Sequence, residues 1–134
     1  MGLTLEKAHE LEAAAIAHAE SMGAAFTVCV VDAGGNVITK ARMDGAGYLS
    51  SEFAEDKAWT SAGIGVPTAA LAGMVQPGEP VFGISHPRVV TFGGGVPLKI
   101  GDNVVGAIGV SGGSVDQDVE VADAAVSAVD GISA

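Results

Sequence analysis

The sequence predicts an α+β fold in which an antiparallel sheet of about five strands carries helices packed on it. Amphipathic helical patterns open and close the chain, and two short glycine-bearing turns each join a pair of apolar segments. The elements follow in the order helix, two strands, two helices, two or three strands, helix. Because hairpins join neighbouring strands, the strands are expected to pair antiparallel. At this length the chain is expected to form a single domain over residues 1–134.

The first half of the chain predicts three helices and a hairpin. Thr4 is a candidate N-cap, and apolar residues recur from there at helical spacing until Gly23 ends the pattern. Ser50 or Ser51 is a candidate cap for the next helix, whose first turns are rich in carboxylates. The expected elements are a helix over 4–22, strands over 26–31 and 37–43, a helix from 50 or 51 to 62, and a short helix over 68–75.

The second half predicts a long loop, a hairpin and a closing helix. Pro77, Pro80 and Pro87 favour a loop over 76–95, with a short strand near 89–92. Strands are expected over 96–100 and 104–110. Ser114 and Gln117 have the spacing of a capping box, so a final helix begins there and ends before Gly131.

Glycine is concentrated between Gly93 and Gly113, where eight glycines fall in or beside apolar strands. Glycine in a strand costs backbone entropy and packs no side chain, so this density indicates a close approach of another backbone or a bulge. Either helices pack directly on this thin surface, or a ligand binds over it.

Composition excludes several classes of function. The net charge of −10 argues against nucleic acid and against anionic membrane surfaces. Aromatic residues make up only 4% of the chain, so each core side chain buries little area and self-association into a homo-oligomer would add burial. Most of the few cations lie mid-chain, and together they could attract an anionic small molecule; they are Lys40, Arg42, Lys57, Arg88 and Lys99.

The single cysteine, Cys29, excludes an intrachain disulfide and a multi-cysteine metal site. It lies in an apolar strand and is expected to be inert. No stretch resembles a signal peptide or a membrane span, so a cytoplasmic location is expected.

The three histidines are candidate metal ligands. His9 and His18 fall nine residues apart on one helix, on opposite flanks of its apolar stripe, so they cannot share a metal. His86 precedes Pro87 in the proline-rich loop, where an extended backbone can aim the imidazole into a cleft. It is the candidate for iron, although a surface position remains the alternative.

Two further clusters carry polar chemistry. Arg42 and Asp44 stand at a strand end, where the guanidinium could hold a carboxylate and Asp44 could orient it or act as a base. Lys57, Thr60 and Ser61 share one helical face next to the only tryptophan, Trp59. A strand-end ion pair and an ordinary polar helix face are the alternatives.

The chain resembles the GlcG-like and HbpS-like heme-binding family, and also the C-terminal domain of PduO-type proteins. The resemblance rests on motifs in the family's order over nearly the whole chain: Val31–Asn36, Arg42–Ala46, Lys57–Ala58, Gly94–Pro97, and Val105–Gly113 followed by Gln117–Asp118. Lys57 to Ser61 departs from the family's usual signature at its last residue. His86 lies in a variable region and gains no support from the family.

The resemblance implies a profilin-like domain in a homo-oligomer, with a pocket where the end of the strand that carries Arg42 meets the triple-glycine loop, Gly93–Gly95. The positions that match family motif residues are Arg42, Asp44, Lys57, Gly94, Gly95 and Gly113. If the protein binds heme or another tetrapyrrole, Arg42, Lys57 and Arg88 would contact the propionates, and His86 or Met43 would approach the iron. A heme-degrading or redox-sensing role is open in this reading. Thr60 and Gly93–Gly95 would complete the ligand-binding wall.

A small catabolic enzyme acting on a carboxylate-bearing metabolite is the alternative. Arg42 would hold the carboxylate, Asp44, His86 or Lys57 would move a proton, and the amides of Gly93–Gly95 would stabilise an oxyanion. A purely structural or regulatory oligomer is a third reading.

Overall fold

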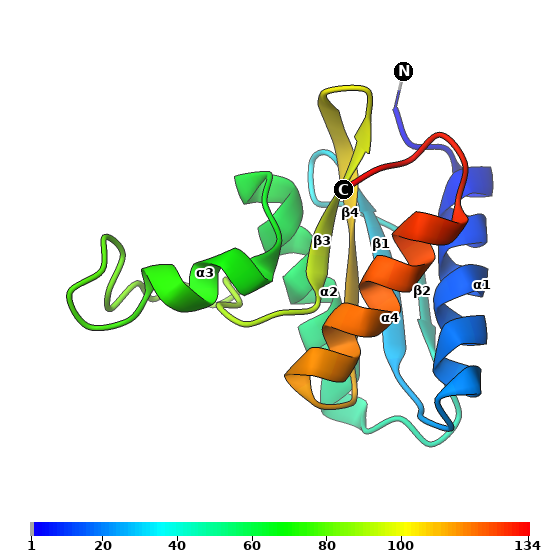
Figure 1. Cartoon of the computed structure of the whole chain (residues 1–134), viewed down its shortest axis with the longest axis horizontal. Coiled ribbons are helices and arrows are strands. Elements are labelled where there is room, and N and C mark those ends of the chain that lie inside the picture. Colours follow the sequence, from blue (N-terminus) through cyan, green and yellow to red (C-terminus); the bar gives the residue numbers. More distant parts are fainter. Residues whose placement is uncertain (1) are drawn as a thin grey trace.

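A four-stranded antiparallel sheet lies between two helical layers in the computed structural model, which describes residues 2–134 (Figure 1). The sheet has the order β2-β1-β4-β3, so the two hairpins meet along β1 and β4. The elements are α1 (Leu5–Ser21), β1 (Thr27–Asp32), β2 (Val37–Arg42), α2 (Tyr48–Ile64), α3 (Thr68–Met74), β3 (Gly95–Ile100), β4 (Asn103–Ser111) and α4 (Val115–Ala128). The predicted α+β class, both hairpins and all four helices are confirmed.

The predicted strand count was too high, because the sheet has four strands rather than about five. The segment expected to form the extra strand, 89–92, forms none. The backbone N–H of Val90 instead donates to Oγ1 of Thr60 on α2, at 3.1 Å. A side chain of the helix thus takes the hydrogen bond that a neighbouring strand would have taken. The likeness to profilin stays a prediction.

One face of the sheet packs against α1 and α4 and forms the larger hydrophobic core. Phe26, Leu11 and Ile108 are fully buried there together with many alanines and valines. Both helices begin with the caps that the sequence predicts. Oγ1 of Thr4 accepts from Lys7 N, and Ser114 and Gln117 form a capping box that satisfies the first amides of α4.

The opposite face of the sheet packs against α2, and this contact explains the glycines of the last third. A Cβ at Gly109 would collide with the carbonyl oxygen of Ala54, and one at Gly95 would collide with that of Lys57. Bare backbone therefore lets the helix approach the strands directly, which is the first of the two interpretations above.

The start of α2 differs from the prediction, since Gly47 rather than a serine occupies its N-cap position. Ser50 lies inside the helix, where its Oγ donates to Gly47 O at 2.6 Å and hydrogen bonds to Thr27 Oγ1 of β1 at 2.8 Å. The serine thus joins the helix to the sheet.

Candidate functional site

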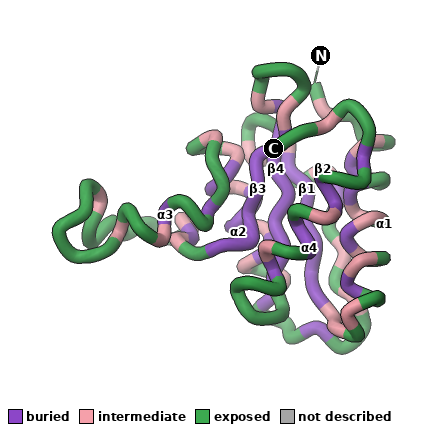
Figure 2. Tube along the Cα trace, in the orientation of Figure 1, coloured by how far each residue is buried: buried purple, intermediate pink, exposed green. Residues whose placement is uncertain are grey.

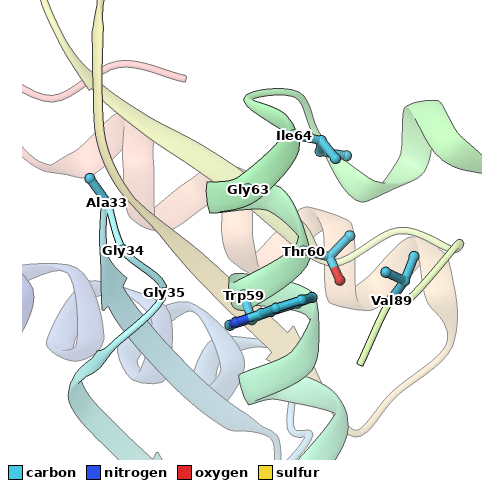
Figure 3. A pocket seen from close by; sticks show the side chains of 8 residues that line it. All are labelled: Ala33, Gly34, Gly35, Trp59, Thr60, Gly63, Ile64 and Val89. Atoms are coloured by element: carbon cyan, nitrogen blue, oxygen red, sulfur yellow. The ribbon is translucent and has the colours of Figure 1, made fainter. Parts of the chain in front are cut away.

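An apolar pocket of about 320 Å³ opens beside Trp59, on the outer side of α2 (Figure 3). This volume lies within the range of about 300–1,000 Å³ that is typical of small-molecule sites. The β1–β2 turn, the last turns of α2 and the chain returning from α3 supply its walls. The lining residues are Ala33, Gly34, Gly35, Trp59, Thr60, Gly63, Ile64 and Val89.

Trp59 is held between these walls by close contacts. Gly35 has a φ of +80° and approaches the indole so closely that a Cβ there would lie 2.6 Å from Cδ1. The imidazole of His86 stacks on the indole, with ring centroids 5.3 Å apart and planes 13° from parallel. The guanidinium carbon of Arg88 lies 4.7 Å from the centroid of the same ring. The only tryptophan of the chain therefore lies at the centre of a built cluster.

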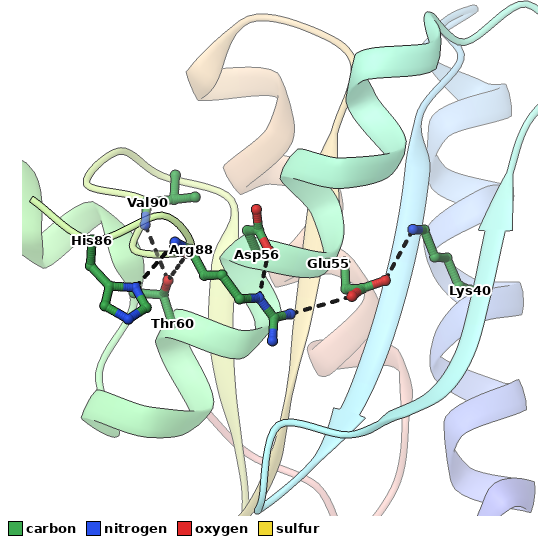
Figure 4. Close-up of polar contacts among 7 residues, drawn as sticks. All are labelled: Lys40, Glu55, Asp56, Thr60, His86, Arg88 and Val90. Atoms are coloured by element: carbon green, nitrogen blue, oxygen red, sulfur yellow. Dashed lines mark hydrogen bonds and ion pairs between the residues drawn. The ribbon is translucent and has the colours of Figure 1, made fainter.

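Thr60 of α2 anchors the segment that contains Arg88 and Val90 to this helix. Its Oγ1 donates to Arg88 O at 3.0 Å and accepts from Val90 N at 3.1 Å (Figure 4). Thr60 is almost fully buried. It is thus a positioning residue for the pocket wall rather than an exposed hydroxyl.

The cations beside the pocket are neutralised by carboxylates of α2. Arg88 donates through Nε to Asp56 at 3.0 Å and lies 3.3 Å from Glu55, whose other oxygen accepts from Lys40 at 3.1 Å (Figure 4). Two cations and two carboxylates leave no net charge. The structure therefore does not form the positive field that the mid-chain cations suggested.

Lys57 faces β3 and β4 from α2 and is fully buried beneath the triple-glycine segment, Gly93–Gly95. Its Nζ donates to Asp118 Oδ2 at 2.8 Å and to Val110 O at 3.0 Å, and lies 5.0 Å from the centroid of the Phe92 ring. A Cβ at Gly94 would lie 2.7 Å from that nitrogen. Lys57 thus has neither solvent nor ligand access in this arrangement.

Burial dominates the electrostatics of this ion pair. Loss of solvent lowers the pKa of Lys57 and raises the pKa of Asp118, and the attraction between the two groups opposes both shifts. Gly113 N also donates to Asp118 Oδ1, at 3.0 Å. The pair joins α2 to α4 around the end of β4.

Arg42, Met43 and Asp44 lie at the far edge of the sheet. They line a shallow hollow with Ile16 and Glu20 of α1, and the Arg42 guanidinium donates to Ala46 O at 2.9 Å. β2 and β3 are the two outer strands, three strand spacings apart, which is about 14 Å. The structure therefore does not place Arg42 and Gly93–Gly95 around one hollow.

The structure brings together only part of the predicted site. Thr60, His86 and Arg88 gather at the Trp59 pocket, whereas Lys57 and Gly93–Gly95 lie inside the protein. Sequence reasoning missed the apolar lining of the pocket, because no pattern in the sequence marked Ile64 or Val89 as lining residues. The ion-pair partner Asp118 was also missed as a site residue, although it lies in a motif of the family resemblance.

The tautomer of His86 bears on metal binding. Its Nδ1 accepts from Arg88 N at 3.1 Å, which leaves the proton of the neutral ring on Nε2. Ligation of iron through Nε2 would move that proton to Nδ1 and break this hydrogen bond, at a cost of about 1 kcal/mol. His18 instead shares a 2.7 Å contact with Glu120. Within residues 2–134, no three His, Cys, Asp or Glu side chains gather as a metal site.

The Cys29 thiol lies on the α2 face of β1 and is fully buried. Burial, with a smaller contribution from Glu55, raises the pKa of Cys29 to about 12. The thiol is therefore an inert core group, as its strand context indicates. Among the residues from 2 onward, no helix has the length and apolar character needed to cross a membrane.

Comparison with known proteins shows the family of this three-layer fold. The family model described as "Haem degrading protein HbpS-like" matches residues 3–127. Corrinoid adenosyltransferase PduO of Citrobacter freundii is 39% identical over 132 residues, which are 96% of this chain and 39% of PduO. The chain thus spans well under half of that relative.

Solved structures give the same result. The PduOC:heme complex superposes with a TM-score of 0.95 at 36% identity, covering 99% of this chain and 98% of that one. A double mutant of HbpS from Streptomyces reticuli superposes with a TM-score of 0.86 at 34% identity, covering 95% of this chain and 86% of that one. The fold is thus that of the PduOC and HbpS structures. The chain belongs to the HbpS-like family.

Proposed function

We propose that this chain binds heme, and that residues 1–134 act as one HbpS-like domain. The observation that carries the proposal is its likeness to the PduOC:heme complex over nearly the full length of both chains. The local chemistry adds support, because the Trp59 pocket offers an apolar wall next to a histidine and an arginine. Heme needs these same features, namely apolar surface for its ring and a nitrogen ligand for its iron.

Trp59, Ile64 and Val89 would supply the apolar wall for the ring, and His86 would supply the nitrogen ligand for its iron. Bound heme would supply an iron centre able to bind a further ligand or to exchange an electron. Arg88 would meet a propionate only by giving up part of its pairing with Asp56 and Glu55.

Binding at this site would rest on the apolar ring and on iron ligation rather than on net charge. The charges beside the pocket already cancel, so the affinity for hemin should change little with salt concentration. Arg42, Met43 and Asp44 take no part in this site, because they lie at the other end of β2 from the β1–β2 turn that lines the pocket.

A hemin titration tests the proposal. Wild-type protein is expected to shift the Soret band to saturation, and His86→Ala is expected to lose the ligated spectrum. His9→Ala and His18→Ala are matched controls, because these histidines lie on α1. An unchanged spectrum with wild type would refute heme binding. Loss of the spectrum in His18→Ala and not in His86→Ala would refute the site while retaining the function.

The enzyme alternative gains no observation in its favour. It needs Arg42 and Asp44 next to His86 or Lys57 in one cleft, and Lys57 is fully buried in its ion pair with Asp118. We therefore propose heme binding alone.

A further inference from the structure

Arg88 is the side chain beside the Trp59 pocket that a carboxylate of a ligand would bind. None of the eight residues that line the pocket, all within residues 2–134, has a charged side chain. The guanidinium carbon of Arg88 lies 4.7 Å from the centroid of the Trp59 ring. Arginine binds carboxylates well because its planar fork makes two parallel hydrogen bonds. Whether the pocket recognises acidic groups therefore depends on whether this guanidinium is available to a ligand.

Two carboxylates of α2 hold the guanidinium. Arg88 Nε donates to Asp56 Oδ1 at 3.0 Å, and Arg88 Nη2 donates to Glu55 Oε2 at 3.3 Å (Figure 4). Asp56 lies three positions before Trp59 on the helix, so the carboxylate and the indole lie on one side of α2. The guanidinium is therefore fixed next to the indole, and its positive charge is already balanced.

A carboxylate of a ligand would meet these two acidic side chains as well as Arg88. To reach the guanidinium it must displace Asp56 or Glu55, or bind next to them, where like charges repel. Glu55 also pairs with Lys40 at 3.1 Å, so the charges of the four side chains cancel before any ligand binds. The net charge of −10 on the whole chain adds to the repulsion. A ligand carboxylate therefore gains little binding free energy from Arg88.

Water remains available to the acidic groups of a ligand on this side of the protein. The segment between α3 and β3, which contains Arg88, is largely exposed, whereas the strands beside it are buried (Figure 2). The Arg88 side chain itself is 36% exposed. Carboxylates at the edge of a bound ring can therefore keep their hydration, and removing their charge costs the complex little.

We propose that Asp56 and Glu55 determine which tetrapyrroles this pocket accepts. Because they hold Arg88, the pocket selects its ligand by the apolar ring and the metal, and it binds rings with uncharged edge groups as readily as rings with free carboxylates. Asp56 is a positioning residue, since it acts through Arg88. The inference rests on the proposed heme binding and adds to it the residues that set the ligand class.

Two iron porphyrins that differ in charge test the inference. The probes are iron(III) deuteroporphyrin IX, which has two free carboxylates, and its dimethyl ester. Quenching of the fluorescence of Trp59, the only tryptophan of the sequence, measures the dissociation constant of each. Wild-type protein should bind the two probes with dissociation constants within about twofold of each other, at low and at high salt concentration.

The variant Asp56→Asn should release Arg88 to the ligand. It is expected to favour the free acid over the ester by about fivefold at low salt, because a partly exposed pair of charges contributes modestly. This preference should weaken at high salt, since ions screen exposed charges. Asp56→Asn/Arg88→Gln should return the ratio of the two dissociation constants to the wild-type value, which a change of pocket shape alone would not do.

Glu52→Gln is the matched control. It removes one negative charge from an exposed position of the same helix, and Glu52 makes no contact with Arg88. This variant should keep the wild-type ratio. A wild-type preference for the free acid above about fivefold, or an unchanged ratio in Asp56→Asn, would overturn the inference while heme binding stands. If neither probe quenches Trp59 in the wild type, heme binding itself is overturned, and the inference with it.

Discussion

The buried ion pair between Lys57 and Asp118 makes a strong prediction about stability. Lys57→Met removes the ammonium while keeping an apolar stem of similar length, and it leaves the Asp118 carboxylate buried without its cation. Asp118 would retain only its hydrogen bonds from the backbone around Gly113. Breaking one side of a buried pair costs about 3–5 kcal/mol, a large share of the roughly 5–15 kcal/mol that holds an ordinary domain folded.

Urea unfolding followed by circular dichroism at pH 7 measures this loss as a shift of the midpoint at constant slope. Lys40→Met is the matched control, because the Lys40–Glu55 pair is only partly buried and should cost at most about 1 kcal/mol. The double variant Lys57→Met/Asp118→Leu should recover much of the loss, since it leaves no unpaired charge. A loss below about 1 kcal/mol in Lys57→Met, or one equal to that of Lys40→Met, would refute this reasoning.

Two further predictions concern the sheet and its first turn. Gly109→Ala should destabilise the protein by about 1–3 kcal/mol or more in thermal unfolding, because the new Cβ collides with Ala54 O. Gly63→Ala has open space around it and should stabilise α2 by up to about 1 kcal/mol in the same measurement. Equal effects of the two substitutions would contradict the contact between helix and sheet. Hydrogen bonds from Asn36 and nearby amides lower the pKa of Asp32 from its usual 3.8. The Asp32 carboxylate therefore stabilises the fold above about pH 4, and this contribution is lost as the pH falls through the lowered pKa. Asp32→Ala should therefore reduce Tm at pH 7 by more than it does at pH 2, and a difference that grows toward acid would show the sign to be wrong.

The elements that could be predicted from sequence are those with local causes. Thr4 and Ser114 form the expected caps because a cap depends only on the next few residues. The segment near Val90 was predicted as a strand and is not one, because its amide bonds to Thr60, thirty positions away. Propensity and periodicity carry no information about such a distant partner.

The candidate site shows the same limit of prediction from sequence. Lys57, Thr60 and Ser61 share a helical face, as their spacing predicts, yet all three are almost fully buried rather than solvated. They can be buried because the strands beneath α2 carry glycine, and because Asp118 supplies a charge from another helix. The stack of His86 on Trp59 likewise depends on the path of the chain between α3 and β3 as it returns to the sheet. These are long-range contacts, which a pattern of neighbouring residues does not encode.

The position of Cys29 has a consequence for how this protein would meet oxidants. The only thiol of the sequence is shut inside the sheet and protonated at every physiological pH. Oxidation of a cysteine by peroxide and disulfide exchange both require an accessible thiolate, so neither reaction would modify Cys29, and no disulfide bond between copies would form.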